Sequence, residues 1–305
     1  MDHRTVAVPA ADHLAPHLLA AAAYVTSFLN PNTRDAYTRD LRIYFAWCEL
    51  HHLPVFGAHK AHLQAFVLHL LQERGNRPAS VARRIHTVTG YYAYAVDEGY
   101  LDATPAHRVK LPKIVEDPGK LTWLTRFELG AVLHAAKASK HPADLALIHL
   151  LGTLGMRVSA ACAVQVQDIT TNPDGYRILR TVGKGDKPSL KALPIPVAQA
   201  VDLAAAGRTT GPLLLRRDGT QMTRRSAARV ITRLVKAAGV EKTITPHSLR
   251  RSHATLALQA GVDLRVVQDS MDHSSSRTTL RYDRIGVPIH AQASHTLAAM
   301  LASAS

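Results

Sequence analysis

The sequence is poor in cysteine, in aromatic residues and in long hydrophobic runs. Its 305 residues include two cysteines, Cys48 and Cys162, and 5% aromatic residues. Two cysteines exclude a disulfide framework, and we expect both to be small buried side chains in a reducing compartment. No run approaches the length of a membrane span, and the short apolar stretch at residues 18–25 lacks the features of a signal peptide. These absences predict a soluble cytoplasmic protein that does not contact a membrane.

Nucleotide-binding and metal-binding motifs are also missing. The pattern G-x-x-x-x-G-K-[ST] occurs nowhere, so the sequence gives no sign of an ATP or GTP site. Eighteen histidines are present, but they are scattered, without H-E-x-x-H or paired cysteine spacing. We therefore expect neither a nucleotide cofactor nor a metal.

Positive charge is what the sequence has in excess. Lys and Arg number 37 against 23 Asp and Glu, which gives a formal net charge of +14 at pH 7. Residues 1–112 contain 11 basic and 9 acidic residues, whereas residues 113–305 contain 26 and 14. Such an excess favours nucleic acid as the partner, with an anionic membrane surface as the second choice. A partner rich in phosphate should bind mainly to the second part.

Apolar residues recur at helical spacing in the first third of the chain. The periodic positions of the first strong helix are Tyr37, Leu41, Tyr44, Phe45 and Cys48. Asn32 or Thr33 is expected to cap this helix, and further helices are expected at residues 63–71 and 80–99. Five arginines of this unit, Arg34, Arg39, Arg42, Arg83 and Arg84, fit a phosphate contact and a solvated basic face equally well.

Helices and one short sheet are expected in the second part. Thr125 should cap a helix, and another should run from about Ala143 through Arg157. The period then changes to alternation in VQVQDI, GYRILRTV and LKALPIP, which predicts short antiparallel strands. Helices resume at residues 196–206 and 223–239; in the latter, Arg225 and Arg229 lie off the apolar stripe. The predicted fold class is mainly α with a small antiparallel β-sheet.

Several polar residues suit a phosphate group. His247 and Arg250 are one helical turn apart, so a guanidinium fork and an imidazole donor can face the same side. Arg157 lies in an apolar stretch and needs either an anionic ligand or a structural acid. Lys184, between two glycines at an expected hairpin tip, can approach a phosphate closely. Taken singly, a capped surface helix or an exposed turn lysine is the commoner explanation of such patterns.

Tyr282 is one of two tyrosines in the basic second part. A free tyrosine has a pKa near 10 and is a poor nucleophile. Its basic neighbours are Arg277, Arg281 and Arg284. Their charges would favour the phenolate, although a packing tyrosine on a terminal helix is the alternative.

In order and spacing, these residues resemble the catalytic set of the tyrosine recombinases, also called the phage-integrase family of site-specific recombinases. The matching positions are Arg157 in R-x-S, Lys184 in G-K-G, His247 and Arg250 in H-x-L-R, His273 and Tyr282. The resemblance covers about residues 20–285. The chain looks similar to the simple two-domain members, Xer-type or Cre-like, without an additional arm-type domain.

The resemblance implies a reaction and a role for each residue. Tyr282 would attack a DNA phosphodiester to form a 3′-phosphotyrosyl link, and a 5′-hydroxyl would leave. Arg157 and Arg250 would hold the nonbridging oxygens. Lys184 would protonate the leaving oxygen, His247 would assist proton transfer at the tyrosine, and His273 would hydrogen-bond the phosphate. No cofactor is implied, because the covalent link conserves the bond energy.

The resemblance also implies domains and partners. We expect a tail at 1–15, a helical core-binding domain at 16–108, a linker at 109–120, a catalytic domain at 121–285 and a C-terminal segment at 286–305. The implied partner is double-stranded DNA, held by a homo-tetramer on paired sites, with accessory proteins or a partner recombinase as further candidates. Such a protein would be cytoplasmic and nucleoid-associated. Backbone contacts are expected from Arg34, Arg39, Arg83, Arg84, Arg225 and Arg229.

Three positions depart from the family pattern. Ala160 stands where an acid is usual, Arg251 replaces a frequent histidine, and Asp272 replaces a glycine before the penultimate histidine. Two other functions stay open at this point. A type IB topoisomerase shares the tyrosine chemistry, and a DNA-binding regulator could have lost catalysis.

Overall fold

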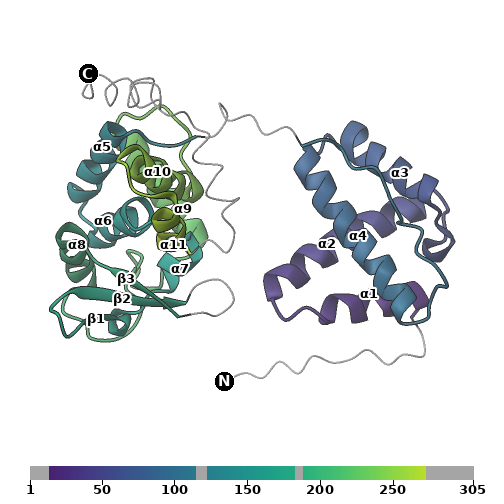
Figure 1. Cartoon of the computed structure of the whole chain (residues 1–305), viewed down its shortest axis with the longest axis horizontal. Coiled ribbons are helices and arrows are strands. Elements are labelled where there is room, and N and C mark those ends of the chain that lie inside the picture. The colour runs from purple at the N-terminus through teal and green to yellow at the C-terminus, as the bar shows by residue number, and fades with distance from the viewer. Residues whose placement is uncertain (1–13, 115–121, 183–187, 273–305) are drawn as a thin grey trace, which may run out of the picture. The chain divides into compact units, whose positions relative to one another are not determined.

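The computed structural model describes residues 14–114, 122–182 and 188–272. Lys184, His273 and Tyr282 lie outside the described residues, as do most of the expected tail, the second half of the expected linker and the whole C-terminal segment. The chain divides into two compact units, Met1–Glu116 and Asp117–Ser305, and each has its own hydrophobic core (Figure 1).

The N-terminal unit is helical. Its elements are α1 (Pro16–Thr26), α2 (Pro31–Leu50), the 3-10 turn η2 (Val55–Gly57), α3 (Lys60–Leu68), the π turn η3 (His69–Glu73) and α4 (Pro78–Asp97). The expected helices are confirmed, but the cap of α2 is Asn30 rather than Asn32 or Thr33. Pro31 explains the difference, because its fixed φ and missing N–H favour the first helical position.

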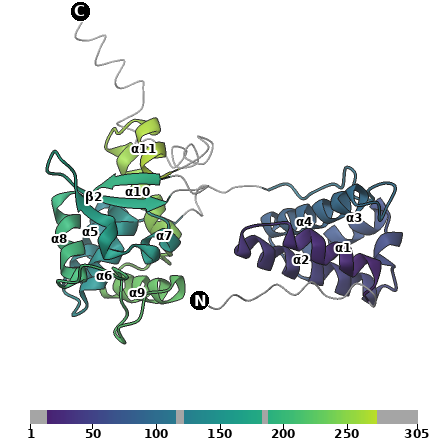
Figure 2. The same ribbon diagram turned by 90° about the horizontal axis from the view of Figure 1, so that it is seen from below.

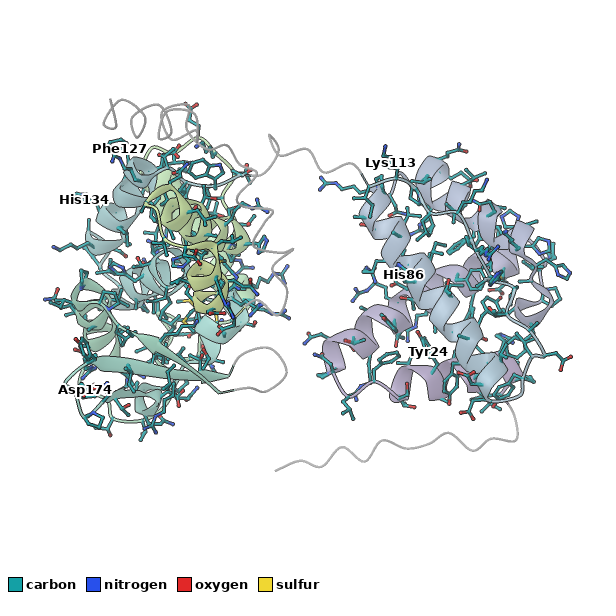
Figure 3. All side chains as sticks on the ribbon, viewed as in Figure 1. Tyr24, His86, Lys113, Phe127, His134 and Asp174 are labelled. Carbon is teal, nitrogen blue, oxygen red and sulfur yellow. The ribbon has the colours of Figure 1, made fainter. Side chains whose placement is uncertain are left out.

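Tyrosine side chains form the centre of this unit. The Tyr44 and Tyr92 hydroxyl oxygens are 2.7 Å apart, and Tyr92 donates to the Val55 carbonyl at 2.6 Å. Burial raises the pKa of both phenols. Tyr24 of α1 (Figure 3) approaches α4 so closely that its hydroxyl would clash with a Cβ atom at residue 90. Gly90 therefore allows α1 to pack against α4.

The C-terminal unit consists of helices and one three-stranded sheet. Its elements are α5 (Arg126–Lys137), α6 (Pro142–Ile148), the π turn η5 (His149–Thr153), α7 (Val158–Ala163), the 3-10 turn η6 (Val166–Asp168), β1 (Ile169–Thr171), β2 (Arg177–Val182), β3 (Pro188–Ala192), α8 (Ile195–Ala205), α9 (Arg224–Ala237), α10 (Pro246–Gln259) and α11 (Leu264–Ser270). Thr125 caps α5 as expected, in a reciprocal pair with Glu128. The arginine-rich helix α9 buries Ile231, Leu234 and Val235, as its stripe predicts.

Two expectations for this unit are wrong. The long helix expected from Ala143 through Arg157 is broken after η5, and Gly155 adopts φ +65°. Arg157 is therefore not inside a helix but is the extended N-cap of α7. The segment VQVQDI forms η6 and only the start of β1, because the Asp168 carboxylate accepts from the Gln165 backbone N–H at 2.9 Å and closes a turn.

The sheet is antiparallel, as predicted, and its strand order is β1-β2-β3. Leu179 pairs with Ile169 on one side and with Lys191 on the other. Leu179 packs into the main core, whereas Leu190 of β3 is 66% exposed. In Figure 2, the strands lie below α11, and Lys191 of β3 donates to the Ser270 carbonyl at the end of that helix. Within the described ranges, we find no helix with the length and apolar character of a membrane span.

The tyrosine pair of the N-terminal unit allows a stability test. Because Tyr92 donates to Val55, the Tyr44 hydroxyl must donate to Tyr92. Tyr92→Phe removes two buried hydrogen bonds: the Tyr44 hydroxyl loses its acceptor, and the Val55 carbonyl keeps only the 3.4 Å bond from the Ala58 backbone N–H. Tyr44→Phe removes only one of these two bonds, the one between the hydroxyls. We expect losses of unfolding free energy of about 2–3 and about 1 kcal/mol, respectively. Urea denaturation measures both, and equal losses would contradict this hydrogen-bond direction.

Candidate active site

Arg157 and Arg250 meet at the C-terminal end of α11, although they come from distant parts of the chain. Arg157 donates from Nη2 to the Asp272 carbonyl at 3.2 Å. Arg250 donates from Nη2 to the carbonyl of Met271 and from Nη1 to that of Gly155. The two guanidinium groups therefore bind consecutive carbonyls of one turn. Their closeness agrees with the prediction that Arg157 and Arg250 share a site.

The Arg250 side chain is buried. The residue is 3% exposed, and a buried charge is costly unless it has partners. Carbonyls at the end of a helix carry partial negative charge, so the end of α11 is a favourable neighbour for a cation. Gly155, whose carbonyl accepts from Arg250, lies two residues before Arg157. The same loop therefore carries Arg157 and binds Arg250.

A lysine from the sheet joins the same turn. Lys191 of β3 is 8% exposed, and its Nζ donates to the Ser270 carbonyl at 2.6 Å. The carbonyls of Ser270, Met271 and Asp272 thus each accept from a different cationic side chain. The sequence analysis missed Lys191, because a lysine in an alternating strand is typical of a solvent-facing side chain.

The start of α10 positions His247. Thr245 and Ser248 form a reciprocal cap, and Pro246 fills the first helical position. His247 is exposed as a residue, but partial loss of hydration lowers its pKa from 6.5, and the charges of Arg251, Arg250 and Arg157 lower it further. The imidazole is therefore neutral at pH 7 and can accept a proton.

Arg251 and Ala160, two departures from the family pattern, have clear surroundings. Arg251 donates from Nη1 to the Thr122 carbonyl at 3.2 Å, which ties α10 to the segment before α5. Ala160 packs against the main core as a partly buried side chain. At residue 160, the chain therefore contributes apolar contact in place of an acid.

Asp272, the third departure, adopts φ +50°, in the left-handed region that favours glycine. Aspartate tolerates this region better than most residues. Burial opposes ionisation of its carboxyl, but hydrogen bonds from Ser189 and Lys191 and the charges of Lys191 and Arg250 outweigh burial and lower its pKa. Asp272 is thus a carboxylate beside the two arginines.

The arginines predicted to contact DNA fall into two groups. Arg39, Arg225 and Arg229 are exposed. Arg34 donates to the Phe28 carbonyl at 3.1 Å. Arg83 and Arg84 both pair with Asp40, whose side chain is fully buried. The second group consists of Arg34, Arg83 and Arg84, whose guanidinium groups already have partners within the protein.

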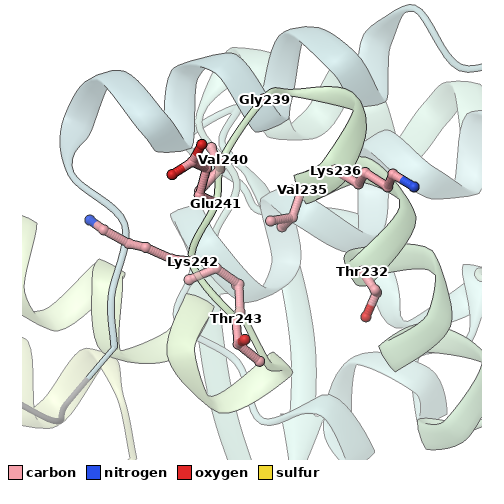
Figure 4. A pocket seen from close by; sticks show the side chains of 9 residues that line it. Thr232, Val235, Lys236, Gly239, Val240, Glu241, Lys242 and Thr243 are labelled. Carbon is pink, nitrogen blue, oxygen red and sulfur yellow. The ribbon is translucent and has the colours of Figure 1, made fainter.

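One pocket of the described chain lies outside the predicted catalytic set. A pocket beside the α9–α10 loop is lined by Thr232, Val235, Lys236, Gly239, Val240, Glu241, Lys242, Thr243 and Ile244 (Figure 4). It contains none of the predicted catalytic residues. Across residues 14–114, 122–182 and 188–272, no group of three His, Cys, Asp or Glu residues could hold a metal ion.

Gly155 provides a test of how the loop approaches α10. A Cβ atom at this position would lie 2.5 Å from His253 Cδ2. The left-handed backbone of Gly155→Ala alone costs about 1–2 kcal/mol, and the contact adds to it. We expect the melting temperature to fall by about 3 °C or more. Gly239→Ala is the matched control, since Gly239 has φ +68° and nothing within 4 Å of its would-be Cβ. Equal losses would contradict a required close approach.

The imidazole of His247 provides a second test. NMR titration of its ring protons should give a pKa below 6.5. Arg251→Gln removes one of the neighbouring charges and should raise this pKa partway towards 6.5, because the hydration loss remains. Since the unfolded imidazole binds its proton at higher pH, His247 should reduce folding stability as pH falls below 6.5. A folded pKa at or above 6.5 would contradict this description.

Comparison with known proteins agrees with the geometry. Residues 122–286 match the model of the phage integrase family, and residues 25–99 match its N-terminal SAM-like domain. The tyrosine recombinase XerC of Mycobacterium sp. (strain KMS) is 33% identical over 274 residues, which cover 84% of this chain and 89% of that protein.

Solved structures share the fold. A XerH site-specific recombinase bound to its palindromic difH substrate has a TM-score of 0.69 at 21% identity, over 82% of this chain and 76% of that one. A lambda integrase tetramer bound to a Holliday junction has a TM-score of 0.70 at 17% identity, over 91% and 80%. The family model and the XerC relative together show that the chain belongs to the phage integrase family, the tyrosine site-specific recombinases.

Proposed function

We propose that this recombinase cleaves and rejoins DNA through Tyr282. The phenolic oxygen attacks a backbone phosphorus, the 3′-phosphotyrosyl bond forms, and the bond to the 5′ oxygen breaks. His247 receives the phenolic proton, and Lys184 protonates the leaving 5′ oxygen. Attack by a 5′-hydroxyl on the phosphotyrosine reverses these steps and releases the tyrosine.

The meeting of Arg157 and Arg250 at the end of α11 is the observation that carries this proposal. Two guanidinium groups can share the negative charge that develops on the nonbridging oxygens in the transition state. His247 lies near both, with the lowered pKa that suits a proton acceptor at pH 7. Asp272 immediately precedes His273, for which we propose a hydrogen bond to the same phosphate.

The substrate and assembly are part of the proposal. We assign duplex DNA to the exposed basic side chains of both units, with residues 16–108 as the core-binding domain and 121–285 as the catalytic domain. Four copies would act on two paired sites, as the lambda integrase tetramer on its Holliday junction suggests. With this substrate, the chain would work in the cytoplasm at the nucleoid.

A covalent-trapping experiment tests the chemistry. A library of nicked duplexes with randomised sequence serves as the substrate, because a short strand released beside the nick diffuses away and leaves the adduct trapped. We expect a denaturant-resistant adduct, and mass spectrometry should place the nucleotide on the peptide that contains Tyr282. Tyr282→Phe should give no adduct, and Arg157→Lys should slow its formation by about 100-fold.

Three outcomes would overturn parts of the proposal. An adduct that persists in Tyr282→Phe would refute the nucleophile. Binding of duplexes without any adduct would favour a DNA-binding regulator. Relaxation of supercoiled plasmids without a shared sequence among trapped duplexes would favour a topoisomerase. Melting temperatures of the variants, compared with the unmodified chain, distinguish lost chemistry from lost folding.

A further inference from the structure

Two side chains of β3 bind the carboxylate of Asp272. Ser189 and Lys191 lie on the same face of the strand, since alternate residues share a face. The Ser189 hydroxyl donates to Asp272 Oδ1 at 2.7 Å, and Lys191 Nζ lies 3.0 Å from Asp272 Oδ2. Each carboxylate oxygen therefore has its own partner from the sheet, and Lys191 also binds the Ser270 carbonyl.

The same aspartate is joined to the arginines through its backbone. Its carbonyl accepts from Arg157, and the preceding carbonyl, of Met271, accepts from Arg250. The side chain of Asp272 thus contacts β3, whereas its backbone carbonyl and that of Met271 contact the two guanidinium groups. Each of these contacts joins residues more than 20 positions apart in sequence, so Asp272 links three distant segments.

The backbone of Asp272 indicates that its side chain is retained for these contacts. Its φ of +50° is a conformation that glycine adopts more easily. The carboxylate is also the group that neutralises the nearly buried ammonium of Lys191. Without it, that ammonium would keep the Ser270 carbonyl but lose the ion pair with this carboxylate.

We propose that Asp272 is a positioning residue of the recombinase: it fixes the turn that holds Arg157 and Arg250 against β3, and so keeps the two guanidinium groups in place. This role rests on the function proposed above for the two arginines. Asp272 acts through its neighbours and does not contact the reacting phosphate. One carboxylate therefore holds the turn at which the two arginines proposed to bind phosphate come together.

Asp272→Asn tests the role of the charge. Asparagine keeps the shape and tolerates the left-handed backbone, but it cannot form the ion pair. The matched control is Asp202→Asn, which removes the same charge from an exposed ion pair between β2 and α8, in which Arg177 Nη2 and Asp202 Oδ1 are 2.5 Å apart. We expect adduct formation on the nicked duplexes to slow by about 10–100-fold in Asp272→Asn, with DNA affinity within about threefold, and to stay unchanged in Asp202→Asn.

Two further variants separate the carboxylate from the backbone. Asp272→Gly relaxes the backbone while removing both side-chain contacts, so it should cleave as slowly as Asp272→Asn without a loss of melting temperature. Asp272→Asn combined with Lys191→Met should be no slower than the slower single variant, because both remove one interaction. Multiplying effects in the double variant would contradict the pairing.

Hydrogen exchange tests the contact between Asp272 and β3 without relying on activity. Amides of β3 should exchange faster in Asp272→Asn than in the unmodified chain or in Asp202→Asn. Adduct formation within twofold of the unmodified chain in Asp272→Asn would overturn the positioning role while leaving the proposed function intact. If the unmodified chain forms no adduct, the proposed function fails and the positioning role fails with it. Faster exchange in β3 would then identify Asp272 as a purely structural contact.

Discussion

The catalytic unit depends on how it accommodates the buried charge of Arg250. A guanidinium with 3% exposure needs partners, and the chain provides backbone carbonyls from a loop and from the end of α11. Carbonyls suit this purpose because they neutralise the charge partially and do not titrate. The arrangement therefore stabilises the fold while keeping a net positive site.

The helices and the sheet were largely predictable from local signals. The Thr125 cap, the apolar stripe of α9 and the strands β2 and β3 follow from residue type and spacing, whereas most of the alternating segment before β1 forms a 3-10 turn. Periodicity failed at Arg157, where continuous apolar residues hide a π turn and a break. A left-handed Gly155 packed against His253 causes that break, and His253 is almost a hundred residues away in sequence. No local pattern contains such a contact.

The candidate active site was only partly predictable from the sequence. Arg157, His247 and Arg250 were identified by order and spacing, and the structure brings them together. The supporting residues were not, because Ser189 and Lys191 read as ordinary strand positions. Asp272 was noted only as a departure from a glycine. Its partners become visible when β3 and the end of α11 are placed side by side, which is a tertiary property.

Asp40 has a consequence for how salt would affect DNA binding by the N-terminal unit. Its fully buried carboxylate already pairs with Arg83 and Arg84, so part of their positive charge is neutralised within the protein. A phosphate that reached them would share cations already half neutralised. The number of ions displaced on binding, and hence the steepness of the salt dependence, would be smaller than a count of surface arginines implies.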